Sequence, residues 1–371
     1  MPPTDPGLAD WLRLARVPGL GDATLRNLLG AIGLPEHVFA ASRTQLAAVV
    51  GEERAQAILR ARDDSAIARE VELALRWADG AGNVILTLAD DDYPRGLLEV
   101  SDPPPLLFLK GRRELLLRQA IAIVGSRNAT AQGIANAEAF ARALSGAGYS
   151  IVSGQALGID AAAHRGGLAG PGSTIAVIGT GADIVYPARN RDLAHAIAAD
   201  GLIVSEFSLG TPAMASNFPR RNRIISALAR AVLVVEAALR SGSLITARLA
   251  GEQGRDVFAI PGSIHAPLSK GCHALIKQGA KLVDSVADVL EELGGAASEA
   301  VPTQRVSPLP TAAAGVDAAL LKAMGYDAVD FDTLMERAGI AAESLSAALL
   351  RLELEGRVAP LAGARYQRLE S

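Results

Sequence analysis

Cysteine is almost absent from this chain of 371 residues, which contains only Cys272. A single thiol excludes an internal disulfide framework and a zinc site built from several thiolates, and the five histidines lack metal-ligand spacing. No apolar run reaches the roughly 18 residues that would span a bilayer. We therefore expect a cytoplasmic protein that has no metal ligands, makes no membrane contact and works in a reducing compartment.

An excess of positive charge is also lacking. Lysine and arginine number 36 against 40 aspartates and glutamates, a formal net charge of −4. Half of the residues are hydrophobic, enough for more than one buried core. The composition therefore predicts a globular protein in which any site for a polyanion is a local patch.

Four regions differ in pattern. Residues 1–80 repeat apolar side chains at helical spacing, which predicts a small helical domain. In 81–294, short apolar β-branched runs alternate with helical segments, as in an α/β, extended Rossmann-like fold with a doubly wound, mainly parallel sheet. Residues 295–312 are rich in Ala, Ser and Pro and are interpreted as a linker. The helix, turn, helix and two short strands expected in 313–371 follow a winged-helix pattern.

The helical region contains VPGLGDATLRNLL (17–29), which resembles a helix-hairpin-helix motif. The backbone amides of its glycine-rich turn could meet a phosphate, or the segment could be a plain interhelical turn.

Small polar residues follow the predicted strands of the α/β region. These strands are expected at 84–88, 121–124, 149–152, 174–178, 201–204, 231–235 and 256–260. Ligands bind beyond the carboxyl ends of parallel strands, and glycine and serine loops at helix N-termini attract anions. We expect a ligand that carries phosphate at residues Gly125, Ser126, Arg127, Ser153, Gly154, Ser241, Gly242 and Ser243.

Signatures of nucleotide binding and of catalysis are missing. VIGTGADIV lacks the third glycine of a dinucleotide fingerprint, and no GxxxxGK[ST] loop is present. Asp160 and His164 are four residues apart, a spacing more typical of a local hydrogen bond or packing. Cys272 and His273 are adjacent on a predicted helix and point apart. We predict that the protein is not an enzyme and has neither catalytic residues nor a cofactor.

The segment NFPRRNRIIS (217–226) carries Arg220, Arg221 and Arg223, and no acid occurs between 207 and 235. A helix beginning near Pro219 would place Arg220 and Arg223 on its solvent side. Arg221 instead projects into the apolar stripe, so we predict that it is held in place for binding.

Asn217 and Phe218 come just before this predicted helix. An aromatic ring and arginines beside a phosphate cradle are how single strands are held, with rings on bases and charges on the backbone. The residues therefore favour a single-stranded polynucleotide.

The motifs IAIVGSRNAT, SGQALGIDAAAHRGGL, TIAVIGTGADIVYPARNRDL and NFPRRNRIIS resemble the DNA-processing protein A (DprA/Smf) family. The resemblance covers most of 120–284. It implies a homodimeric, non-catalytic core that binds single-stranded DNA and helps to load the RecA recombinase during natural transformation. It also implies a role for particular residues: phosphate binding by Arg127, Arg220, Arg221, Asn222 and Arg223, with Ser153, Gly154, Ser241, Gly242 and Ser243 lining the site.

Two positions depart from many relatives. A basic residue usual after the YP motif is replaced by Ala188, followed by Arg189, and Leu157 stands where many relatives have arginine. The winged-helix region 313–371 has six basic and nine acidic residues, so we expect it to contact protein or its own core rather than duplex DNA. The alternative function is that of a Rossmann-type nucleotide phosphoribohydrolase, whose PGGxGT stretch is absent.

Overall fold

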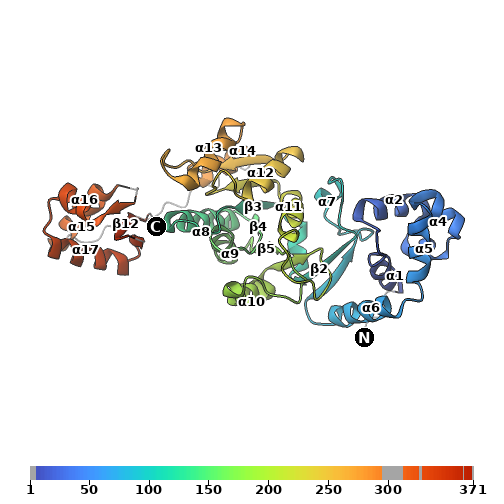
Figure 1. Cartoon of the computed structure of the whole chain (residues 1–371). Helices are drawn as coiled ribbons and strands as arrows, with labels where there is room; N and C mark the ends of the chain where they lie inside the picture. Colours follow the sequence, from blue (N-terminus) through green and yellow to red (C-terminus); the bar gives the residue numbers. More distant parts are fainter. Residues whose placement is uncertain (1–5, 295–311, 326–327, 362, 370–371) are drawn as a thin grey trace.

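A computed structural model describes residues 6–294, 312–325, 328–361 and 363–369. An N-terminal helical unit lies at one end, a large sheet with helices on both faces lies in the middle, and a small C-terminal unit lies at the other end (Figure 1). The linker predicted at 295–312 falls, except for its last residue, outside the described residues.

The N-terminal unit contains six helices: α1 (Pro6–Leu14), α2 (Asp22–Ile32), α3 (Pro35–Ala40), α4 (Arg43–Val50), α5 (Glu52–Ala61) and α6 (Ser65–Ala78). Local sequence signals start two of them, since Ser42 and Gln45 form a capping box at α4 and Asp64 caps α6. The apolar faces of the helices meet in one cluster that also contains Ile85 and Phe108 of the sheet. The helical unit is therefore packed directly onto the core.

The central sheet has the order β1-β2-β6-β5-β4-β3-β7-β8-β9. Its strands are β1 (Asn83–Thr87), β2 (Leu106–Gly111), β3 (Ala120–Val124), β4 (Ser150–Ser153), β5 (Thr174–Val177), β6 (Leu202–Ser205), β7 (Ala231–Val234), β8 (Asp256–Ala259) and β9 (Lys281–Leu282). Strands β3 to β9 run parallel, which confirms the mainly parallel, Rossmann-like fold class.

The edge at β1 differs from the prediction. The strand expected at 84–88 pairs antiparallel with β2, a strand that sequence analysis missed, and β2 pairs antiparallel with β6. The connection from β1 to β2 contains only one turn of helix, α7 (Arg95–Leu98), rather than a crossover helix. Without a crossover helix the chain returns in the opposite direction, as in a hairpin.

Helices cover both faces of the sheet. One face carries α8 (Ala131–Gly146), α9 (Ile159–Leu168), α10 (Arg191–Asp200) and α14 (Val286–Glu292), and the other carries α11 (Asn217–Leu228), α12 (Ser243–Glu252) and α13 (Lys270–Lys277). Alternate residues of β3 divide between them, with Ile121 and Ile123 packing on one face and Ala122 and Val124 on the other.

The C-terminal unit contains α15 (Ala312–Met324), β10 (Val329–Asp330), α16 (Phe331–Ala338), α17 (Ala342–Leu354), β11 (Val358–Leu361) and β12 (Arg365–Arg368). The three strands form a sheet in the order β10-β12-β11, which completes a winged helix. Arg351 of α17 makes a bidentate ion pair with Asp317 of α15. The second helix of the motif thus uses its arginine inside the unit, and β12 lies beside α8 of the core (Figure 1).

Candidate functional site

The carboxyl ends of β3 to β8 share one edge of the sheet, because these six strands are parallel. A cavity of about 860 Å³ opens at this edge, which we call the groove. Most of the residues predicted for the site line the groove: Gly125, Ser126, Arg127, Phe218, Arg221, Asn222, Ser241, Gly242 and Ser243. The other predicted residues do not line it: Ser153, Gly154, Asn217, Arg220 and Arg223.

Two of these other residues hold the backbone beneath the groove. The Ser153 hydroxyl donates to the Ile123 carbonyl oxygen at 2.6 Å, and Asn217 Nδ2 donates to the Gly179 carbonyl oxygen at 3.0 Å. Both side chains are buried. Asn217 is also the first residue of α11, so the helix begins two residues earlier than predicted and Pro219 lies in its first turn. Ser153 and Asn217 fix the end of β4 and the start of α11.

Arg221, which projects into the apolar stripe of its helix, forms the floor of the groove and is only 4% exposed. Its Nη1 donates to the Val177 carbonyl oxygen at 2.5 Å, whereas its Nε is buried without a partner among the described residues. A Cβ on Gly154 would lie 1.9 Å from Nη1, so a glycine is needed beside the guanidinium. Burial lowers the pKa of Arg221 to about 10; the Asp160 carboxylate opposes this shift and the Arg127 cation adds to it.

Aromatic rings flank the second arginine. The Arg127 guanidinium lies over the Phe218 ring at 5.5 Å from its centroid, and the Phe218 and Tyr186 rings are 5.6 Å apart at 34°. The ring of Phe218 packs against Gly179, where a side chain would not fit, since a Cβ on residue 179 would lie 2.9 Å from the ring. Tyr186 also lines the groove and is 46% exposed. Sequence analysis missed Tyr186, although its position in the IVYP segment after β5 was a signal.

The loop after β7 supplies hydroxyl and amide groups. The Ser241 and Ser243 hydroxyls are 2.7 Å apart, and Gly242 accepts a hydrogen bond from Asn222 Nδ2 at 3.4 Å. Helix α12 begins at Ser243, so its free amides and the positive end of its dipole point toward the groove. The exposed Arg240 also lines the groove and was not predicted.

Asp160 is buried but lines the groove, and His164 lies below it. His164 Nε2 accepts from the Gln155 backbone N–H at 3.2 Å, and its Nδ1 lies 2.7 Å from the Thr174 hydroxyl oxygen. Burial, with Arg221 next, lowers the pKa of His164 to about 3, so the ring is neutral. Burial raises the pKa of Asp160, an effect that the Arg221 cation opposes. The spacing thus reflects packing and local hydrogen bonds, as expected.

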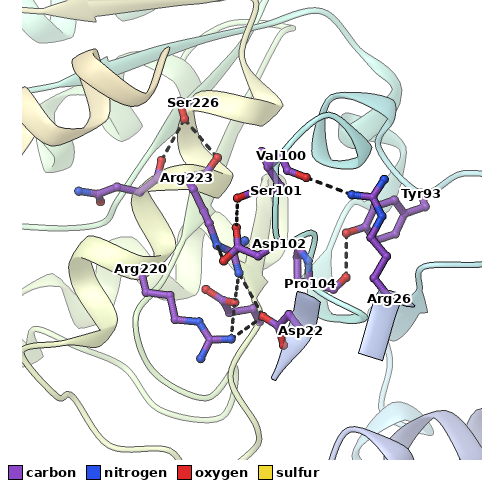
Figure 2. Close-up of polar contacts among 12 residues, drawn as sticks. Asp22, Arg26, Tyr93, Val100, Ser101, Asp102, Pro104, Arg220, Arg223 and Ser226 are labelled. Carbon is purple, nitrogen blue, oxygen red and sulfur yellow. Dashed lines mark hydrogen bonds and ion pairs between the residues drawn. The ribbon is translucent and has the colours of Figure 1, made fainter. Parts of the chain in front are cut away.

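The other face of α11 carries a network of two arginines and three carboxyl side chains, namely Arg220, Arg223, Asp22, Asp102 and Glu206 (Figure 2). Arg223 Nη2 lies 2.6 Å from Glu206 Oε2, and Arg223 Nε lies 3.1 Å from Asp102 Oδ2. Arg220 Nη2 contacts Asp22 at 2.6 Å and Glu206 at 3.1 Å. Asp22 begins α2, so these contacts join the N-terminal unit to the core.

This network corrects the interpretation of NFPRRNRIIS as one cluster. Arg223 was expected on the solvent side of its helix, yet its side chain is only 8% exposed. Helical projection accounts for one buried face, whereas α11 packs on the sheet and also faces the 99–105 loop and the N-terminal unit. Burial raises the pKa of Glu206, and Arg223 and then Arg220 oppose that shift. Carboxylates therefore balance Arg220 and Arg223, whose side chains lie outside the groove.

The helix-hairpin-helix turn lies beside the network of Arg220 and Arg223. Leu20, Gly21 and Asp22 line a separate cavity of about 510 Å³ together with Phe207 and Arg220. The Arg220 guanidinium lies 5.6 Å from the centroid of the Phe207 ring. The turn therefore meets the charged network of the core.

Glu236, which follows β7, and the thiol of Cys272 both form hydrogen bonds within the core. Both carboxylate oxygens of Glu236 accept hydrogen bonds from Thr130, one from its backbone N–H at 2.9 Å and one from its hydroxyl at 2.6 Å. Burial raises the pKa of the Cys272 thiol to about 11, which disfavours the thiolate. Within the described residues no group of three or more His, Cys, Asp or Glu side chains could hold a metal ion, and no helix is long and apolar enough to cross a membrane.

Fold and site together define a three-part Rossmann-like protein with arginines and glycine-serine loops on one sheet edge. Family models match 84–294 (DNA recombination-mediator protein A), 304–364 (DprA winged helix domain) and 12–64 (SAM-like helix-hairpin-helix tandem). The chain belongs to the DNA recombination-mediator protein A (DprA/Smf) family.

Relatives agree with this assignment. The chain is 39% identical to protein Smf of Escherichia coli over 365 residues, 97% of this chain and 95% of that protein. It is similar to the crystal structure of DprA from Streptococcus pneumoniae, with a TM-score of 0.68 and 40% identity over 77% of this chain and 97% of that one. A structure of DprA from Helicobacter pylori, described for its single-stranded DNA binding mode, has a TM-score of 0.52 and 32% identity over 56% of this chain and 95% of that one.

Proposed function

We propose that this protein binds single-stranded DNA in the groove and acts as a recombination mediator without catalysis. In this proposal Arg127 and Arg221 hold backbone phosphates, and Phe218 with Tyr186 offers ring faces to the bases. The Ser241 loop and the N-terminus of α12 add hydrogen-bond donors for a further phosphate. The printed description of the H. pylori relative supports this choice of ligand.

One observation carries the proposal. Arg127 and Arg221 both line the groove, where the Arg127 cation adds to the lowering of the Arg221 pKa by burial and the Asp160 carboxylate opposes that lowering. Two cations beside one buried carboxylate favour an added anion, and a phosphate between them would relieve their repulsion. The neighbouring rings favour a nucleic acid over free phosphate.

The test is a titration of fluorescein-labelled oligo-dT followed by anisotropy at two salt concentrations, with nucleotide release measured in parallel. We expect Arg127→Ala to weaken binding and to reduce the slope of log K against log[salt] by about 0.7, the contribution of one phosphate contact. Arg142→Gln is the matched control, because it removes one exposed arginine from α8 on the opposite face of the sheet. Unchanged binding in Arg127→Ala contradicts the site, and nucleoside hydrolysis contradicts the non-catalytic function.

The family resemblance also leads us to propose a homodimer that loads RecA onto single strands during natural transformation, in the cytoplasm. The edge of the sheet offers a surface for dimerisation, because β9 has both residues exposed and Leu282 is 48% exposed. Light scattering of Leu282→Arg tests this point: we expect the mass of a monomer. A dimer mass in that variant contradicts this interface.

A further inference from the structure

A second acid-free segment lies outside the predicted site. Residues 257–283 contain no Asp or Glu, yet they include three lysines and two histidines. In a chain whose acids outnumber its bases, this is a local excess of positive charge. The segment forms the end of β8, the short 3-10 helix η3 (Pro267–Ser269), α13 and β9.

Backbone hydrogen bonds join this segment to the wall of the groove. The Ala237 N–H donates to the Leu268 carbonyl oxygen at 2.6 Å, and the Gly271 N–H donates to the Ala237 carbonyl oxygen at 2.7 Å. Leu268 and Arg240 both line the groove. The surface of α13 is therefore continuous with the groove, and α12 and α13 pack on the same face of the sheet.

Three cations on this surface are available to a ligand. Arg240, Lys270 and Lys277 are exposed, and none of them has an ion-pair partner within the part of the chain that the structure describes. Lys270 Nζ donates to the Ile264 carbonyl oxygen, which leaves its charge uncompensated. Lys281 differs, because it is paired with Glu292. Seven residues separate Lys270 from Lys277, so they share one face of α13 about 10 Å apart.

Apolar side chains lie among these cations. Leu239 is 64% exposed and Ile264 is 66% exposed, and they occupy the loops that follow the neighbouring parallel strands β7 and β8. Exposed leucine and isoleucine between cations suit a ligand with apolar faces and a charged backbone. A single polynucleotide strand has both.

We propose that Leu239, Arg240, Ile264, Lys270 and Lys277, which we call the exit strip, bind the part of a single strand that leaves the groove. Phosphates contact the three cations, and bases pack on the two apolar side chains. This proposal rests on the proposed binding of single-stranded DNA in the groove. The exit strip would be a second segment of the path that the strand follows, and only strands long enough to leave the groove would reach it. This path leads from the groove toward β9.

The test compares two lengths of labelled oligo-dT, about 5 nucleotides to fill the groove and about 20 to reach the exit strip. In the full chain, Lys270→Gln with Lys277→Gln, which leaves the groove residue Arg240 in place, should weaken binding of the long oligonucleotide about tenfold and reduce its salt slope by about 1.4, two phosphate contacts at about 0.7 each. Binding of the short oligonucleotide should stay within about twofold of the wild type. Arg76→Gln with Arg142→Gln is the matched control, because it removes two exposed arginines elsewhere.

A second variant tests the apolar contacts. Leu239→Ser with Ile264→Ser should weaken binding of the long oligonucleotide without changing its salt slope, because no charge is removed. Light scattering should give each variant the same mass as the wild type, which separates the exit strip from dimerisation. Equal losses at both lengths, or no loss at the long one, overturn the proposal. Failure of the wild type to bind either oligonucleotide overturns the proposed function itself, and the exit strip with it.

Discussion

The two faces of helix α11 use arginine in opposite ways. On one face Arg221 shares the groove with Arg127, and its nearby carboxylate is the buried Asp160. On the other face Arg220 and Arg223 meet three carboxylates that come from α2, the 99–105 loop and the end of β6. Consecutive arginines therefore differ in function because their neighbours differ. The groove has an excess of positive charge, whereas the two arginines of the network are matched by three carboxyl groups.

The network face should matter most for folding. Arg223→Ala leaves the buried Glu206 carboxylate with only Arg220 as a partner, so we expect the free energy of unfolding to fall by about 3 kcal/mol. Arg220→Ala removes a half-exposed partner and should lower it by no more than about 1 kcal/mol. Urea unfolding followed by circular dichroism measures both. Equal effects of the two variants would mean that burial does not distinguish the two arginines.

The groove face should matter most for binding. Arg221→Ala should weaken binding of oligo-dT about a hundredfold, because a desolvated cation is lost from the floor of the groove. Arg220→Ala should leave affinity within about threefold, since its charge is already balanced by Asp22 and Glu206. Fluorescence anisotropy on folded variants checks this pair. Equal losses of affinity in Arg221→Ala and Arg220→Ala would show that both arginines belong to one binding site.

A fall in pH should act differently on the buried residues beneath the groove and on the network of Arg220 and Arg223. The pKa of buried His164 is about 3, below its ordinary value, so the unfolded chain binds a proton that the folded one refuses. Its contribution to stability is complete above pH 6.5 and declines as pH falls toward 3, by about 2 kcal/mol between pH 7 and 5. Burial raises the pKa of Glu206, so the folded chain holds this proton more readily than the unfolded chain. The contribution of Glu206 to the free energy of unfolding therefore rises as pH falls, opposite to that of His164.

Urea unfolding at pH 7 and pH 5 measures this effect. The wild type should lose stability between the two values, and His164→Gln, which cannot titrate, should lose about 2 kcal/mol less than the wild type. An identical decline in both proteins would assign the pH dependence to other groups.

Much of this arrangement could be predicted from the sequence. The apolar runs predicted the parallel strands β3 to β8, and most of the small polar residues that follow them line the groove. The helical projection placed Arg221 within an apolar stripe, and in the structure this side is buried, with Arg221 only 4% exposed. These signals are local, since each depends on residues within a few positions of one another.

The network could not be predicted in this way. Asp22 is 198 residues from Arg220, and no periodicity connects them. The count of acids between 207 and 235 also stopped one residue short of Glu206, the carboxylate that contacts both Arg220 and Arg223. The strand β2 was missed because its antiparallel return depends on a short connection and not on its own composition.

Helix α11 contributes Arg221 to the groove and Arg220 to the contact with Asp22 of the N-terminal unit. A shift of the helix that moved Arg221 in the groove would also move Arg220, which contacts Asp22. Any such linkage must be reciprocal: if a bound strand strengthens or weakens docking of the N-terminal unit by some factor, docking changes the affinity for the strand by that same factor. Through this helix of 12 residues, strand binding in the groove and docking of the N-terminal unit would depend on each other, although the two regions are far apart in the sequence.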